Sequence, residues 1–124
     1  MEERDYLVKE IEKLKLLLAK ILRLRQEDKD ADIREEARSA YAGFFGLDID
    51  GADIATLREA VGRVNGPQKL ELLAELLEAD LAAGHEPIAQ EIRTQVLECV
   101  ITEIDRQYAA EGTFSFTNQL RKKK

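Results

Sequence analysis

The side chains in this sequence that could do chemistry are few. Its single histidine, His85, lies in the turn Gly84-His85-Glu86-Pro87 between two expected helices, where an imidazole could act as a general acid or base. A general base also needs a nucleophile and an orienting group, which are assembled in space and are not visible in sequence. The helix dipole alone also favours a histidine after a helix C-terminus. We therefore predict that the protein is not an enzyme, and we keep as the alternative an enzyme or enzyme subunit that uses His85 near a small-molecule pocket.

Three aspartates around a glycine in the middle of the chain resemble a calcium loop. Asp48, Asp50 and Asp53 flank Gly51. An EF-hand with its required glycine at this position would begin at a glycine and end at a leucine, and neither residue supplies the necessary carboxylate. We interpret the segment as a helix-capping turn.

No other motif for a metal or cofactor is present. Cys99 is the single cysteine, so it can form neither an intrachain disulfide nor a paired-cysteine zinc site. The sequence has no glycine-rich phosphate loop and no nucleophile elbow. Glu71, Glu75, Glu78 and Asp80 recur at helical spacing, but without the Glu-x-x-His pairs of a di-iron bundle we interpret them as a solvated face. We predict no catalytic residue, no metal and no cofactor.

The charge balance argues against polyanionic partners. The net charge is −6, and an acidic domain repels nucleic-acid backbones and anionic membranes. The basic tail Arg121–Lys124, together with Arg4 and Lys9, leaves weak nucleic-acid binding as an alternative, although we expect a solvated terminus. No apolar run approaches the roughly 18 residues of a membrane span, and the N-terminus lacks signal-peptide features. We expect a cytoplasmic protein with neither nucleic acid nor membrane as a partner.

Helices must position all of these side chains, because apolar residues recur at the helical period between glycine and proline breaks. Pro67 and Pro87 each fall where a helix should start. The length of 124 residues suits one domain. The sequence predicts a single helical domain over residues 1–111, followed by an extended tail over residues 112–124. The domain is all-α, with about five helices at residues 3–25, 32–45, 53–64, 67–83 and 86–110.

The first expected helix carries a heptad-like seam of apolar residues at 4-3-4-3 spacing: Leu7, Ile11, Leu14, Leu18 and Ile21. Further leucines widen this stripe beyond what one neighbouring helix covers. Helical arrays need capped ends, and a two-fold dimer is the commonest closed assembly. We therefore predict that the seam is either the capping face of the array or the face of a homodimer.

Residues 73–97 resemble a degenerate tetratricopeptide-type repeat, in which two antiparallel helices meet at a glycine-containing turn. In this resemblance Gly84 supplies the turn and Ala89 the small contact residue, while Ile92, Val96 and Leu97 form the packing face. The proline-containing end of the repeat is absent, and its aromatic positions are aliphatic here.

The chain as a whole resembles an uncharacterised bacterial family of small tetratricopeptide-like helical proteins. The resemblance rests on Asp5-Tyr6-Leu7-Val8, on Leu18-Ala19-Lys20-Ile21-Leu22, and on Gly46-Leu47-Asp48 before a short capped helix. It implies a tetratricopeptide-like antiparallel helical array with a long N-terminal helix. The family has no established activity, so the resemblance implies a fold and not a reaction.

These observations favour a small protein–protein interaction module or adaptor, in which the partner is another protein or a second copy of the chain. The expected groove lies between the second and fourth helices and takes a helix or an extended peptide. The candidate contacts are Tyr41, Phe45, Leu57 and Arg58. The two aromatic side chains also suit a hydrophobic core, which is the competing interpretation.

Overall fold

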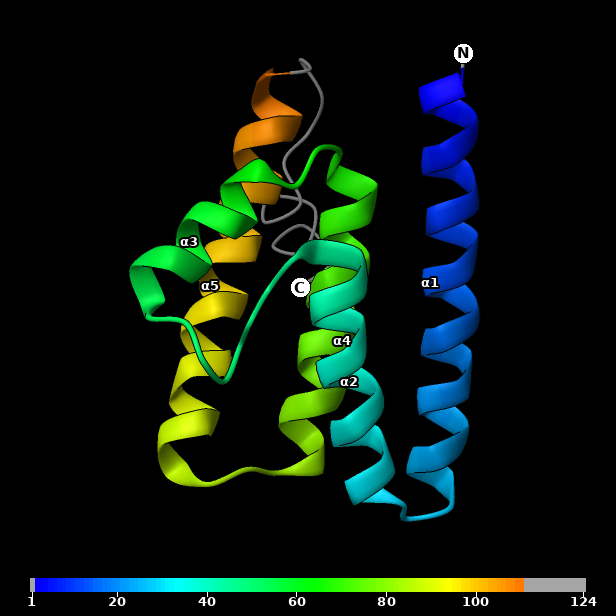
Figure 1. Cartoon of the computed structure of the whole chain (residues 1–124), viewed down its shortest axis with the longest axis vertical. Coiled ribbons are helices and arrows are strands. Elements are labelled where there is room, and N and C mark those ends of the chain that lie inside the picture. The colour runs from blue at the N-terminus through cyan, green and yellow to red at the C-terminus, as the bar shows by residue number, and fades with distance from the viewer. Residues whose placement is uncertain (1, 111–124) are drawn as a thin grey trace, which may run out of the picture.

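The computed structural model describes residues 2–110 of the chain, and the side chains of residues 8–110 (Figure 1). Its helices are α1 (Glu2–Gln26), α2 (Asp30–Phe45), α3 (Ile54–Arg63), α4 (Pro67–Ala83) and α5 (Pro87–Ala110). Residues 2–110 thus confirm the predicted all-α array of five helices, with ends at most two residues from those predicted. The predicted extended tail lies outside the described residues.

The fourth helix is the centre of the molecule. It packs against α1, α2 and α5, while α3 lies across the outside of α5 (Figure 1). The sequence explains why α4 is central: apolar residues cover most of its circumference, and a helix of that kind is buried by its neighbours. Leu70, Leu73 and Leu77 are fully buried at its centre. Helices α1 and α2, and likewise α4 and α5, run antiparallel to each other (Figure 1).

Local chemistry sets the helix ends. Pro67 and Pro87 occupy the first positions of α4 and α5, where the missing N–H costs nothing. Gly46 ends α2 in the left-handed conformation, with φ of 63°, which glycine adopts without a steric penalty. Asp53 caps α3 by accepting a hydrogen bond from the Thr56 N–H at 2.8 Å. This hydrogen bond lowers the pKa of the Asp53 carboxyl below its ordinary value.

The aspartate loop before α3 is the helix-capping turn that the sequence predicts. Besides the Asp53 cap, the Asp48 carboxylate accepts a hydrogen bond from the Gly51 N–H at 3.1 Å. Within residues 8–110, no three metal-binding side chains come together in one place.

The apolar seam of α1 is covered by its own chain. Leu14 and Ile21 are fully buried, and Ile11 and Leu18 are partly buried against the core. The seam packs on α2 and α4, so α1 lies along the edge of the array as a capping helix would. The side chain of Leu7 lies outside the described part. None of the described helices is long and apolar enough to cross a membrane.

Candidate functional site

The buried charged side chains of the core lie near the turn that connects α4 to α5. Asp80 in the last turns of α4 and Arg93 on α5 are 0% and 2% exposed, and the Arg93 Nε donates to Asp80 Oδ2 at 2.7 Å. A buried charge is costly unless a partner of opposite charge and hydrogen bonds compensate it. Burial lowers the pKa of the Arg93 guanidinium, but its hydrogen bonds and proximity to Asp80 and Asp50 outweigh that effect and raise the pKa.

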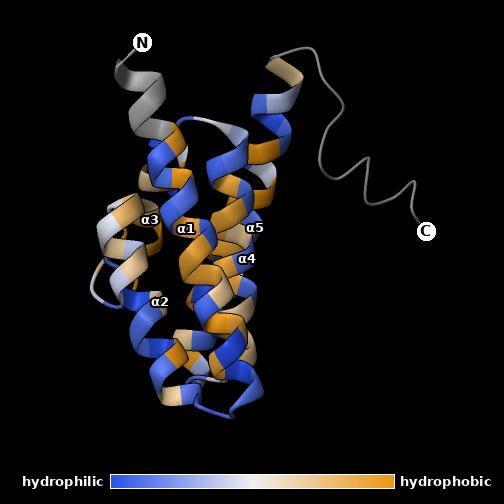
Figure 2. Ribbon diagram, turned by 90° about the vertical axis from the view of Figure 1, so that its right-hand side faces the viewer, coloured by the Kyte–Doolittle hydropathy of each residue, from blue (hydrophilic) through white to orange (hydrophobic). Residues whose placement is uncertain are grey.

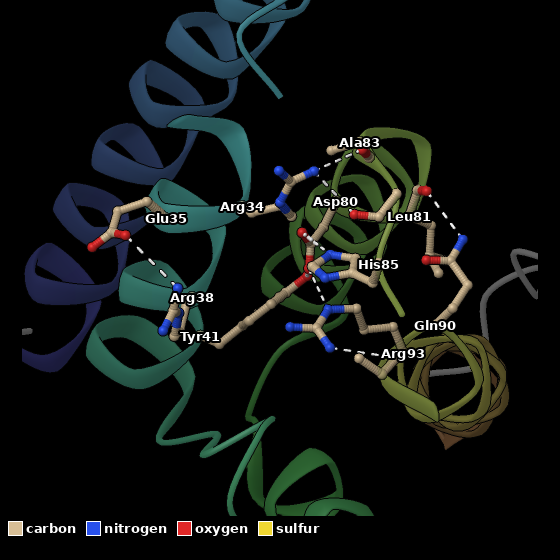
Figure 3. Close-up of polar contacts among 12 residues, drawn as sticks. Arg34, Glu35, Arg38, Tyr41, Asp80, Leu81, Ala83, His85, Gln90 and Arg93 are labelled. Atoms are coloured by element: carbon tan, nitrogen blue, oxygen red, sulfur yellow. Dashed lines mark hydrogen bonds and ion pairs between the residues drawn. The ribbon is translucent and has the colours of Figure 1, made fainter. Parts of the chain in front are cut away.

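The second donor to Asp80 comes from α2. The Tyr41 hydroxyl donates to Asp80 Oδ2 at 2.8 Å (Figure 3), and the Tyr41 ring is fully buried. Burial is the largest cause that raises the pKa of Tyr41 well above its ordinary value, and the negative charge of Asp80 adds to it. Tyr41 therefore stays protonated and fixes α2 to α4.

The third donor is His85, in the turn between α4 and α5. Its Nε2 lies 2.7 Å from Asp80 Oδ1, and its side chain is 10% exposed. Because a carboxylate only accepts hydrogen bonds, Nε2 carries the proton that it shares with Asp80. Nδ1 forms no hydrogen bond with residues 8–110 and is not among their buried unpaired atoms. The carboxylate thus orients the imidazole as the aspartate does in a catalytic triad.

Two further groups extend this network toward solvent. A terminal nitrogen of Arg93 donates to Asp50 Oδ1 at 3.1 Å, in the loop before α3. From α2, one terminal nitrogen of Arg34 donates to the Ala83 and Gly84 carbonyls at 3.0 and 3.1 Å (Figure 3). These carbonyls lie at the end of α4, where the helix dipole favours a cation.

An open pocket of about 320 Å³ lies beside this network. It is lined by residues from α2, from the loop before α3, from the turn after α4 and from α5: Ala31, Arg34, Glu35, Arg38, Asp50, His85 and Arg93. None of them has a hydroxyl or thiol. The lining can therefore bind by charge and hydrogen bonds and can exchange a proton at His85.

The second candidate surface is the outer face of α1, defined by Val8, Leu16 and Leu22. Within the side chains described, the exposed large apolar residues are Val8 at 50%, Leu16 at 72%, Leu22 at 56% and Ile88 at 79%. Three of these four lie on α1 outside its buried seam, with Leu16 opposite the seam and Leu22 beside it, and Figure 2 shows apolar and polar segments alternating along α1. Beside Leu22, a groove of about 270 Å³ runs between α1 and α4. Its lining is apolar at Leu18, Ile21 and Ala79 and charged at Arg25, Glu75 and Glu78.

The residues predicted to contact a partner do not form one exposed surface. Tyr41, Phe45 and Leu57 are buried in the core, and only Arg58 is exposed. The apolar faces of α2 and α3 are the faces that the core needs, so the expected groove between α2 and α4 is not lined by these side chains. Tyr41 and Phe45 are core residues, which was the competing interpretation of these two aromatic side chains.

Asp80 and Arg93 were the functional residues that sequence reasoning missed. The prediction of a solvated face was wrong for Asp80, which is fully buried, although Glu75 and Glu78 are exposed. A signal existed, because Asp80 follows the 3–4 spacing of Leu73 and Leu77, and Arg93 that of Val96 and Val100. A charged residue at a core position of each of two adjacent helices indicates a buried ion pair.

Replacing Tyr41 by phenylalanine is expected to lower the free energy of unfolding by about 1.5–3 kcal/mol at pH 7, the range for a hydrogen bond to a charged group. The pKa of Tyr41 is raised in the folded protein, so its contribution is complete below the ordinary tyrosine pKa and is lost as pH rises above it. The difference between wild type and Tyr41→Phe should therefore narrow above about pH 10 in urea unfolding. A difference that is the same at neutral and alkaline pH would contradict this role.

Comparisons with protein-family models, with curated proteins and with solved structures gave no match. The resemblance to the tetratricopeptide-like bacterial family therefore stays a prediction from the sequence. The site has to be interpreted from its own geometry.

Proposed function

We propose that the protein is a protein–protein interaction module that binds its partner through the outer face of α1. The observation that carries the proposal is the exposure of Val8, Leu16 and Leu22 on one helix. Apolar side chains left in water are unfavourable by about 25 cal/mol per Å², and a protein surface that keeps several of them together is typical of a contact site. This surface replaces the predicted groove at Tyr41, Phe45 and Leu57.

The charge around this face indicates the kind of partner. Between Val8 and Gln26 the exposed charged side chains are six basic ones and one acidic one: Lys9, Lys13, Lys15, Lys20, Arg23 and Arg25, against Glu12. Apolar residues on a basic helix fit an amphipathic helix with acidic flanks. Two copies of this basic face would repel each other, so a different protein is favoured over the homodimer that the sequence also allowed.

Further parts of the proposal rest on the sequence. We infer a cytoplasmic, tetratricopeptide-like module of the bacterial type, and the antiparallel α4–α5 pair that meets at Gly84 supports this inference. The alternative nucleic-acid site depends on the tail Arg121–Lys124, which lies outside the described residues. For the alternative enzyme, His85 has its orienting carboxylate in Asp80, but the residues that line the pocket in the described part of the chain include no hydroxyl or thiol for His85 to activate. We therefore propose a binding protein and not an enzyme.

Capture of a partner from a lysate of the native host is expected to depend on Leu16 and Leu22. The double variant Leu16→Ser/Leu22→Ser should lose the bound protein, identified by crosslinking and mass spectrometry, because it removes the apolar contact without touching the core. Ile88→Ser is the control, since it removes an even more exposed apolar side chain from α5. Light scattering of the wild type tests the homodimer: a dimer that Leu16→Ser/Leu22→Ser dissociates would assign this face to self-association instead. Equal capture by all three proteins would contradict the proposed surface.

A further inference from the structure

The pocket beside His85 contains more hydrogen-bond donors than the described protein uses. One terminal nitrogen of Arg34 donates hydrogen bonds to the Ala83 and Gly84 carbonyls. The Nε and the other terminal nitrogen of Arg34 have no hydrogen-bond partner among residues 8–110. Arg38 forms no hydrogen bond in this part of the chain, and its ion pairs with Glu35 and Asp50 are long, at 3.7 and 4.0 Å. Two guanidinium groups thus line the pocket with N–H donors that form no hydrogen bond with residues 8–110.

The acceptors that line the same pocket do not match these donors. Asp50 Oδ1 is already bonded to Arg93, and Glu35 is mostly exposed to solvent. Asp80 is fully buried behind His85 and accepts from Tyr41, Arg93 and His85. A guanidinium has no acceptor atom and a planar set of donors that matches the paired oxygens of a carboxylate or phosphate. The unused donors therefore suit a group that carries several acceptor oxygens and a negative charge.

We propose that this pocket binds the carboxylate or phosphate group of a small molecule, held by Arg34 and Arg38 from α2, with His85 at its inner wall. The volume of about 320 Å³ lies at the lower end of the usual range for small-molecule sites, which suits a compact anion. This site is separate from the outer face of α1 and goes beyond the proposed protein-binding function.

The buried network gives this pocket a fixed shape before any ligand enters. Asp80 orients His85 and Arg93, and Tyr41 fixes Asp80 to α2, which also carries Arg34 and Arg38. His85 and Arg93 are therefore already ordered and lose little conformational entropy on binding. Asp50 is the competing anion in the site, because its carboxylate lies between Arg93 and Arg38. Removing its charge should strengthen ligand binding, an effect that a merely structural role of the network does not predict.

Titration of the full chain with inorganic phosphate and, separately, with acetate tests the proposal, at constant ionic strength and with binding followed by NMR shifts. The wild type should show saturable binding with shifts at Arg34, Arg38 and His85. Arg34→Gln/Arg38→Gln should bind at least about tenfold more weakly, because charge-assisted hydrogen bonds to the ligand are lost. Arg38→Gln alone should weaken binding without a risk to folding, since Arg38 is exposed and forms no hydrogen bond with residues 8–110. Asp50→Asn should bind several-fold more tightly.

The matched control is Arg58→Gln/Arg63→Gln, which removes two exposed arginines from α3 and changes the net charge equally. It should leave the affinity unchanged. Tighter binding of phosphate assigns a phosphorylated ligand, and tighter binding of acetate assigns a carboxylic acid. Absence of saturable binding to the wild type by both anions, or equal affinities for the wild type, the α2 variants and the α3 control, would overturn the proposed site.

Discussion

Replacement of Arg93 by methionine is expected to lower the free energy of unfolding by about 3–5 kcal/mol, the range for removing one partner of a buried ion pair. Methionine fills a similar volume, so the loss comes from the carboxylate of Asp80, which stays buried without its cationic partner. Chemical denaturation followed by circular dichroism measures the change. Arg63→Met is the matched control, because Arg63 is exposed and its ion pair is long; it should change the stability by less than about 0.5 kcal/mol.

The double variant Asp80→Leu/Arg93→Met separates a missing partner from a missing side chain. Replacing both members of a buried pair by apolar residues is often neutral, so the double variant should be more stable than Arg93→Met alone. Full recovery is not expected, because Tyr41 and His85 also lose their acceptor. A loss below about 1 kcal/mol in Arg93→Met would show that the buried pair does not hold the α4–α5 turn in place.

Leu14→Ala is expected to lower the free energy of unfolding by about 2–5 kcal/mol, whereas Leu16→Ala should change it by less than about 0.5 kcal/mol. The two positions carry the same residue type on the same helix, but Leu14 is 1% exposed and Leu16 is 72% exposed. Truncation of Leu14 leaves a cavity between α1 and its neighbours, and truncation of Leu16 removes only surface. Urea unfolding of both variants in parallel gives the comparison.

This pair of variants also tests which side of α1 faces the core. If the seam of Leu14 and Ile21 were a dimer face and not the intrachain contact, the effect of Leu14→Ala would depend on protein concentration. The structure predicts an effect independent of concentration, since α1 packs on α2 and α4 of its own chain. Equal losses in Leu14→Ala and Leu16→Ala would contradict the placement of the helix.

The helices could be predicted because their signals are local. Pro67, Pro87, Gly46 and Asp53 act on the few residues beside them, so their positions in the sequence fix where helices start and stop. The turn around Gly51 was predicted for the same reason. Element ends of this kind need no knowledge of which helices meet.

The arrangement of the helices and the site could not be predicted in the same way. Leucines lie all around α1, and the sequence does not say that Leu14 faces the core while Leu16 faces solvent, since that depends on where α2 and α4 lie. The network joins Tyr41, Asp80 and Arg93, which are 39 and 13 residues apart. His85 was recognised as a candidate acid or base, but its carboxylate partner was assigned to a solvated face. Pairing between helices decides all of these features.

The three hydrogen bonds that Asp80 accepts restrict which substitutions this sequence can accumulate during evolution. One carboxylate accepts hydrogen bonds from Tyr41, His85 and Arg93, which lie on three different segments. Loss of one donor leaves the other two in place, so Tyr41 or His85 can be replaced one at a time at a limited cost. Replacement of Asp80 by an apolar residue removes the hydrogen-bond acceptor of all three donors at once, and no single second substitution compensates all three. Mutational tolerance in this network is therefore unequal: Tyr41 and His85 can change separately, whereas Asp80 and Arg93 can change only together.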